Sequence, residues 1–221
     1  MIIALIGLKG GTGKTTLGIG IACEAMQRGR RVLCLDTDPC GPVAYWAQRS
    51  ADDSVPTVLG MSGSALEDPS HLRALALGYD LTVVDCPSGS IRTSLNVLAA
   101  ADLALIPCGP SPLDVWSLTD SFALVTRARL TNPGLHAATV INRADPRTLL
   151  GETLPGDLRR CGVPTLSSHV GRRVLHAESI AAGASVTTYA PRSAAAAEVR
   201  ELVDEVEALT PRCSADAHVQ H

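Results

Sequence analysis

The chain has 221 residues, of which 46% are hydrophobic and 19% charged, and its formal net charge is −3. This hydrophobic share excludes a disordered chain. The unbroken apolar runs, such as residues 2–6, are too short to predict a membrane-spanning helix. The small negative charge does not suggest an obligate nucleic-acid binder, although it is compatible with a local basic face. The seven cysteines form no C-x-x-C pair, so we expect reduced thiols. Met1 precedes a strand-like run without a basic leader, which predicts a cytoplasmic protein.

Short, nearly continuous apolar runs alternate along the chain with longer amphipathic segments. The runs predict strands over residues 2–6, 32–35, 81–84, 103–106 and 138–141, with weaker ones at 58–59 and 165–170. Helices are predicted over roughly residues 15–29, 42–51, 69–78, 91–101, 113–130, 148–161, 173–183 and 193–209. Asp68-Pro69 has the pattern of a helix start, and Gly29 and Gly162 have that of helix ends. The order predicts an α/β fold: a doubly wound, mostly parallel sheet flanked by helices, with one domain over residues 1–209 and a frayed tail over 210–221.

Four of the predicted strands are followed directly by glycine or by a polar side chain. Gly7 follows the first strand, Asp36 and Asp38 the second, Asp85 the strand over residues 81–84, and Asn142 the strand over 138–141. Ligands of open α/β sheets lie beyond the carboxyl ends of the strands. The sequence therefore predicts a ligand site at this edge of the sheet.

The segment after the first strand has the composition of a phosphate-binding loop. It reads KGGTGKTT over residues 9–16 and contains both lysines of the chain. Backbone N–H groups and the helix dipole are expected to hold a polyphosphate at Gly10, Gly11, Thr12, Gly13 and Thr16. Lys14 would neutralise the β- and γ-phosphates, and the Thr15 hydroxyl would bind Mg²⁺. The alternative is an ordinary glycine-rich turn, since Leu8 stands where the pattern G-x-x-x-x-G-K-[ST] begins with glycine.

This departure from the pattern resembles the deviant Walker A motif of the ParA/MinD family of ATPases, in which a lysine precedes GG-x-GKTT. Further segments are similar to motifs of that family, namely residues 33–39 (LCLDTDP), 81–87 (LTVVDCP), 106–114 (IPCGPSPLD), 140–143 (VINR) and 172–198. The similarity spans about residues 1–207 and is greatest to small members without an N-terminal helix-turn-helix. It implies a P-loop NTPase fold, Mg²⁺-dependent hydrolysis of ATP, and a sandwich homodimer in which Lys9 reaches the nucleotide of the partner.

The resemblance and the residue chemistry together assign roles to the polar side chains at the strand ends. Lys9, Lys14 and Asp38 are the predicted catalytic residues, with Asp38 orienting the attacking water. Asp36 and Asp85 are expected to support Mg²⁺ together with Thr15, although both aspartates at residues 36 and 38 could instead cap strand ends. Cys40 replaces the customary glutamine of the D-x-D-P-Q-G motif.

Two further residues are predicted at the adenine base. The Asn142 amide has a donor and an acceptor that suit adenine, although a turn residue before Arg143 is an equally simple interpretation. Pro191 is expected to pack on the base, as the corresponding loop does in the family. Cys86 and Cys108 also end strands; we interpret them as buried thiols and not as ligands of an iron–sulfur cluster like that of the related nitrogenase iron protein.

The sequence favours a ParA-type ATPase, cytoplasmic and nucleoid-associated, that positions a plasmid or other cargo. ATP would close the dimer, the dimer would bind DNA without sequence preference, and a cargo-bound ParB-like adaptor would stimulate hydrolysis. The candidate DNA contacts are Arg172, Arg173, Arg192 and Arg200, which Arg159 and Arg160 extend; solvated helix faces are the alternative. The alternative is a MinD-like membrane-associated ATPase that positions the cell-division site or an organelle. It would need a basic amphipathic C-terminal helix, and the tail does not predict one. An amide-forming ligase or an arsenite-pump ATPase would need extra loops or a second domain.

Overall fold

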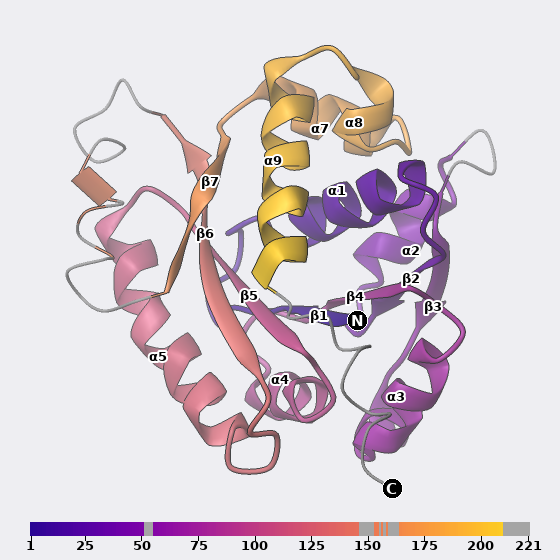
Figure 1. Cartoon of the computed structure of the whole chain (residues 1–221), viewed down its shortest axis with the longest axis vertical. Helices are drawn as coiled ribbons and strands as arrows, with labels where there is room; N and C mark the ends of the chain where they lie inside the picture. Colours follow the sequence, from indigo (N-terminus) through magenta and orange to yellow (C-terminus); the bar gives the residue numbers. More distant parts are fainter. Residues whose placement is uncertain (51–54, 146–152, 155, 157, 159–163, 210–221) are drawn as a thin grey trace, which may run out of the picture.

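The computed structural model describes the whole chain except residues 51–54, 146–152, 155, 157, 159–163 and 210–221. The described strands form one sheet in which all pairs are parallel, in the order β3-β2-β4-β1-β5-β6-β7 (Figure 1). They are β1 (Ile2–Leu5), β2 (Val32–Asp36), β3 (Thr57–Gly60), β4 (Leu81–Asp85), β5 (Leu103–Cys108), β6 (His136–Ala144) and β7 (Thr165–Gly171). The predicted mostly parallel sheet is thus confirmed.

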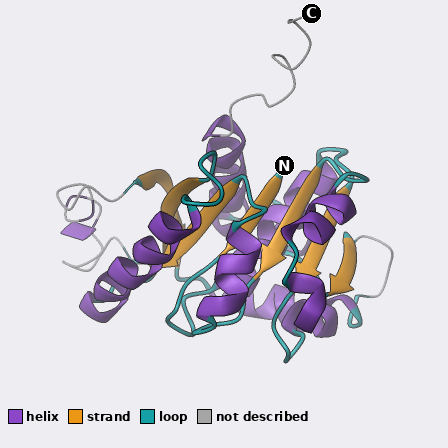
Figure 2. Ribbon diagram, turned by 90° about the horizontal axis from the view of Figure 1, so that it is seen from below, coloured by secondary structure: helices purple, strands orange, loops and turns teal. Residues whose placement is uncertain are grey.

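The described helices cover both faces of the sheet (Figure 2). They are α1 (Lys14–Gln27), α2 (Pro42–Ala47), the 3₁₀ turn η1 (Gly63–Leu66), α3 (Pro69–Ala76), α4 (Ile91–Leu98), α5 (Pro112–Ala128), α7 (Val174–Ala181), α8 (Val186–Tyr189) and α9 (Ala194–Leu209). None of them is both long and apolar enough to cross a membrane.

The central strand β1 shows why the sheet is buried on both sides. Side chains alternate along a strand, so Ile3 and Leu5 pack into a core with α1, α2 and α9. Ile2 and Ala4 pack on the opposite face into a second core with α3, α4 and α5. Both faces therefore need apolar residues, and this explains the unbroken apolar run at the start of the chain.

The ends of several elements agree with the sequence patterns. The Asp68 side chain accepts a hydrogen bond of 2.8 Å from the Ser70 N–H and caps α3, and Pro69 is the first residue of that helix. Gly29 follows α1 with a φ of 82°, as expected for a helix C-terminus. Both weak strands exist as β3 and β7. The helix predicted over residues 148–161 and the helix end at Gly162 lie largely or wholly outside the described residues.

Among the described elements, two were not predicted, and both are four residues long. The turn η1 lies between β3 and α3. Helix α8 has a capping box in which Ser185 and Thr188 exchange hydrogen bonds between side chain and backbone. Elements of four residues span only about one helical turn, so no apolar position repeats within them and hydrophobic periodicity does not reveal them.

Candidate phosphate-binding site

The loop between β1 and α1 lies at the switch point of the sheet, where β1 has β4 on one side and β5 on the other. Gly11 and Gly13 have φ angles of 73° and 93°, in the left-handed region that favours glycine. A Cβ on Gly13 would stand 2.2 Å from the Asn142 side-chain nitrogen, so a side chain does not fit there. The loop thus turns the backbone into the N-terminus of α1, where N–H groups are free to bind an anion.

Lys14 is buried and its ammonium lies inside the loop. Its Nζ donates to the Ser88 hydroxyl at 2.7 Å and to the carbonyls of Gly7 and Lys9 at 3.2 and 3.4 Å. Burial lowers the pKa of Lys14, and the charge of Asp85 opposes this shift. Because the hydrogen-bond partners are neutral, an anion in the loop would be a stronger partner for the ammonium.

Thr15 and Asp85, two of the three residues that the sequence assigned to Mg²⁺, are hydrogen-bonded to each other. The Thr15 hydroxyl donates to Asp85 Oδ2 at 2.6 Å. Burial raises the pKa of Asp85 to about 7, the Thr15 hydrogen bond opposes the shift, and the nearby Asp36 charge adds to it. Among the described residues, the buried Asp85 Oδ1 and Thr12 Oγ1 have no hydrogen-bond partner. Orphaned oxygens beside a Thr–Asp pair fit a hydrated cation and its phosphate ligands.

Asp36 and Asp38 lie at the end of β2 but are engaged differently. Asp36 is buried and its Oδ2 accepts hydrogen bonds from the backbone of Val43 and Ala44, at 2.8 and 3.2 Å, so it caps α2. Its Oδ1 accepts from the Asp38 N–H at 3.1 Å. Asp38 is half-buried and its Oδ1 accepts from the N–H of the exposed Cys40 at 2.9 Å. Asp36 therefore holds the loop that carries Asp38. The predicted support of Mg²⁺ by Asp36 stays a prediction.

The Lys9 side chain contacts its own subunit in this structure. Its Nζ forms an ion pair of 2.6 Å with Asp114, which is 6% exposed in the first turn of α5. The Ser111 hydroxyl donates to the same carboxylate at 2.7 Å. Burial would raise the pKa of Asp114, but the bonds from Lys9 and Ser111 outweigh it and the pKa lies below its ordinary value. Asp114 lies within the family-like motif at residues 106–114, but its pairing with Lys9 has no local signature because the two residues are remote in sequence.

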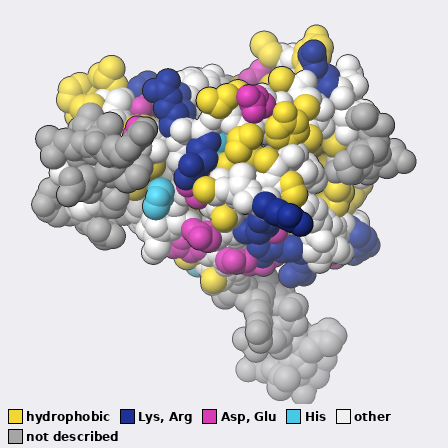
Figure 3. Space-filling model, turned by 90° about the horizontal axis from the view of Figure 1, so that it is seen from above, with side chains coloured by type: hydrophobic (Ala, Val, Ile, Leu, Met, Phe, Trp, Pro, Cys, Tyr) yellow, Lys and Arg dark blue, Asp and Glu magenta, His cyan; other side chains and the backbone are white. Residues whose placement is uncertain are grey.

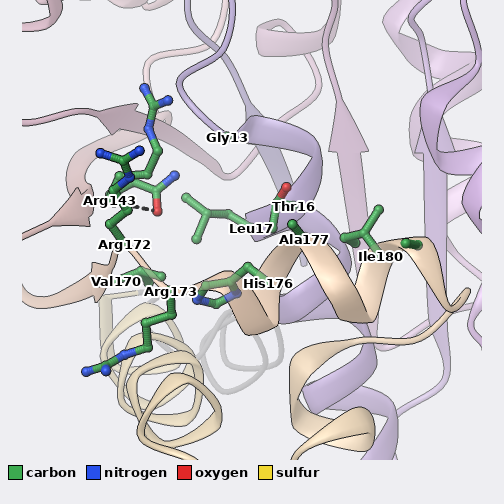
Figure 4. Close-up of a pocket in the computed structure, with 13 residues that line it drawn as sticks. Gly13, Thr16, Leu17, Arg143, Val170, Arg172, Arg173, His176, Ala177 and Ile180 are labelled. Atoms are coloured by element: carbon green, nitrogen blue, oxygen red, sulfur yellow. Dashed lines mark hydrogen bonds between the residues drawn. The ribbon is translucent and has the colours of Figure 1, made fainter.

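A cavity of about 440 Å³ opens beside the loop (Figure 4). Gly13, Thr16 and Leu17 line it from the loop and α1, and Ile180 lines it from α7. Asn142 also lines it, and the Asn142 amide nitrogen donates to the Thr12 carbonyl at 2.7 Å. Its contact with adenine stays a prediction.

Pro191 is exposed and is not among the residues that line the cavity, and its carbonyl accepts a hydrogen bond of 2.9 Å from Arg200. The predicted packing of Pro191 on the base therefore stays a prediction as well.

The four arginines predicted to bind DNA differ in their surroundings: two lie near carboxylates, and the other two are exposed. Arg173 forms an ion pair of 2.5 Å with Glu198, and Figure 4 shows its side chain directed away from Leu17 and Thr16. Arg200 lies 3.5 Å from a Glu24 carboxylate oxygen. Arg172 and Arg192 are exposed, and Arg172 also lines the cavity. Arg159 and Arg160 lie outside the described residues. On the face shown in Figure 3, basic side chains lie among acidic and hydrophobic ones and do not form one continuous basic surface.

A parallel sheet with a glycine-rich loop, a buried lysine and a Thr–Asp pair at its switch point defines a P-loop nucleotide-binding protein. The model of the VirC1 protein family matches residues 1–152. The chain therefore belongs to this family, within the ParA/MinD type of deviant Walker A ATPases. The family resemblance inferred from the sequence is thus confirmed.

The similarity to individual relatives extends over nearly the whole chain. The maintenance of carboxysome distribution protein A of Halothiobacillus neapolitanus is 36% identical over 210 residues, which cover 92% of this chain and 95% of that protein. The chromosome-partitioning ATPase Soj of Thermus thermophilus is 28% identical over 236 residues, 93% of this chain and 95% of that protein. The structure of the septum site-determining protein MinD of Pyrococcus horikoshii, complexed with Mg-ADP, has the same fold: its TM-score is 0.73 at 21% identity, over 93% of this chain and 95% of that one.

Proposed function

We propose that the protein is a Mg²⁺-dependent ATP hydrolase that positions a cargo in the cell. The observation that carries the proposal is the pair of Thr15 and Asp85, joined at 2.6 Å beside orphaned buried oxygens in a loop that holds Lys14. A polyphosphate with its cation supplies the missing partners of these groups. The Mg-ADP of the MinD structure, a protein of the same fold, supports this ligand class.

The residues of the site divide the work of hydrolysis among them. Thr15 would hold Mg²⁺ directly and Asp85 through water, while Lys14 contacts the phosphates. When bound, Mg²⁺ neutralises negative charge on the β- and γ-phosphates. Asp38 is half-buried on a loop that Asp36 holds, and this supports the proposal that Asp38 orients the attacking water molecule.

Association and DNA binding complete the proposed cycle. Lys9 is 35% exposed and, in the described part of the chain, forms an ion pair with one carboxylate, that of Asp114, so it can leave its own subunit for the nucleotide of a second one. ATP would then convert monomers into sandwich homodimers, and a ParB-like adaptor would stimulate turnover. A dimer presents two copies of each exposed basic side chain, so Arg172 and Arg192 would contact DNA bivalently and without sequence preference. The protein would accordingly localise to the nucleoid.

The relatives favour two kinds of cargo. Soj is a chromosome-partitioning ATPase, which supports a DNA cargo such as a plasmid. The carboxysome distribution protein is 36% identical, which supports a carboxysome as the second candidate. Deletion of the gene in its host separates them: unstable inheritance of a plasmid indicates the first, and clustering of carboxysomes indicates the second.

Phosphate release and calorimetry test the enzymatic part of the proposal. We expect Lys14→Ala to abolish ATP binding, and removal of Mg²⁺ by a chelator to stop turnover. Asp38→Ala should bind ATP as the parent does but hydrolyse it about 100-fold more slowly. The matched control is Asp120→Ala, which removes an exposed carboxylate of α5 and should leave both quantities unchanged. Unchanged ATP affinity of Lys14→Ala would overturn the phosphate-loop assignment.

A further inference from the structure

Arg143 has a backbone conformation that arginine rarely adopts. Its φ is 57°, and it is the one residue other than glycine with positive φ in the described part of the chain. The Asn142 side-chain oxygen accepts a hydrogen bond of 2.9 Å from the Arg143 N–H and fixes this conformation. Asn142 is in turn tied to the Thr12 carbonyl at 2.7 Å. Strain of this kind persists where the surroundings over-determine it, and it concentrates at functional sites.

The conformation directs the Arg143 side chain toward the carboxylate that holds Lys9. Asp114 Oδ2 and Arg143 Nη2 lie 2.5 and 3.2 Å from the point where a Cβ on Gly109 would stand. The two groups therefore face each other across Gly109, whose missing side chain leaves the space between them open. Asp114 thus lies between two cations: Lys9 in direct contact at 2.6 Å, and Arg143 close by.

The two cations differ in what holds them. Lys9 is partly exposed on the phosphate loop, whereas Arg143 is anchored by a strained backbone at the end of β6. If Lys9 leaves, Asp114 remains buried and keeps the Ser111 hydrogen bond but loses the cation in direct contact with it. A buried carboxylate without an opposite charge is strongly destabilising. The guanidinium fork of arginine suits a carboxylate better than an ammonium does, so Arg143 is equipped to replace Lys9.

We propose that Arg143 is a positioning residue that takes over the Asp114 carboxylate when Lys9 leaves to contact the nucleotide of a second subunit. The inference rests on the proposed sandwich dimer and deepens it. The exchange lets Lys9 change subunits without leaving a buried charge unpaired. Arg143 thereby sets the free energy of ATP-dependent association, while nucleotide binding by the monomer does not require the exchange.

Variants of the full-length protein test this exchange. Arg143→Gly removes the side chain and is suited to a φ of 57°, so it is expected to fold. We expect it to bind ATP within about threefold of the parent but to dimerise with ATP at least about tenfold more weakly in analytical ultracentrifugation. Arg143→Lys should retain part of the association, and Arg127→Ala, on an exposed position of α5, should match the parent.

A second change in the Arg143→Gly background separates the proposed role from a structural one. Asp114→Asn removes the charge that needs a partner, so the double variant should recover dimerisation toward the parent value. Parent-like dimerisation of Arg143→Gly, or a double variant no better than the single one, overturns the inference alone. A parent that stays monomeric with ATP and Mg²⁺ overturns the proposed dimer and the inference together.

Discussion

The side-chain amide of Asn142 donates a hydrogen bond of 2.7 Å to the carbonyl of Thr12 and thereby joins the end of β6 to the phosphate loop. The two residues are 130 positions apart in the sequence. The same contact occupies the space beside Gly13, where a Cβ would stand 2.2 Å from the amide nitrogen. The loop conformation and the far side of the cavity are thus coupled through one side chain.

We expect Asn142→Ala to weaken ATP binding about tenfold, because the loop loses its tie and the cavity loses a polar group. In the parent, the Asn142 side-chain amide keeps one hydrogen and one lone pair for the predicted contact with adenine, because the other hydrogen and lone pair bind Thr12 and Arg143. ATP should therefore lose more affinity than GTP in parallel titrations by calorimetry. Equal losses for the two nucleotides would restrict Asn142 to the role of fixing the loop.

Lys9→Ala should retain ATP affinity but lose ATP-dependent dimerisation in light scattering. The substitution also removes the ion pair of Asp114, so the free energy of unfolding in urea should fall. We expect a loss of about 1–2 kcal/mol, less than the loss of about 3–5 kcal/mol typical of a broken buried pair, because Arg143 lies near enough to substitute.

Adding Asp114→Asn to Lys9→Ala should restore stability without restoring dimerisation, since the two effects have different causes. Dimers that form without ATP in both the parent and Lys9→Ala would count against the sandwich.

Arg192→Ala tests DNA binding by the ATP-bound protein. If each Arg192 contacts one phosphate, a dimer makes two such contacts, and the slope of log affinity against log salt should fall by about 2. The control is the pair Arg173→Ala and Glu198→Gln, which removes an ion pair at no change in net charge and should leave the slope nearly unchanged. Titrations of random duplex DNA across a salt series measure both. Absence of ATP-dependent binding by the parent at low salt would reject the DNA-based model.

Glu198 provides a pH-dependent contribution to stability. Burial would raise its pKa, but hydrogen bonds from Arg173 and from the Gly171 N–H outweigh burial and lower it. A lowered pKa in the folded state stabilises the protein above the unfolded pKa, and this stabilisation is lost as the pH falls through the folded value. Glu198→Gln should therefore be less stable than the parent at pH 7, by about 1 kcal/mol after solvent screening, and equal to it in strong acid.

Thermal or urea unfolding between pH 7 and pH 3 measures this difference. Glu201→Gln on the same helix is the control, because Glu201 is exposed. A stability difference that persists unchanged at pH 3 would show that Glu198 acts through packing and not through its charge.

Local patterns in the sequence determined the fold class and the position of the site. Strands buried on both faces require unbroken apolar runs, and the run at residues 2–6 is one of them. The glycines at residues 11 and 13 indicate left-handed backbone, and their spacing from Lys14 indicates a loop that opens a helix. Such features depend on neighbouring residues, so they can be read without the tertiary structure.

Only the tertiary structure decided which side chains pair with which. Asp114 and Lys9 form an ion pair of 2.6 Å, and Arg173 forms one with Glu198 of α9. The sequence alone does not distinguish these paired basic residues from the others. The left-handed Arg143 has no local signature, because its conformation is imposed by the Asn142 side chain and the packing around it. Ion pairs and strained residues depend on distances between segments remote in sequence. The sequence therefore located the phosphate site, whereas the folded chain determined which charges around it are already engaged.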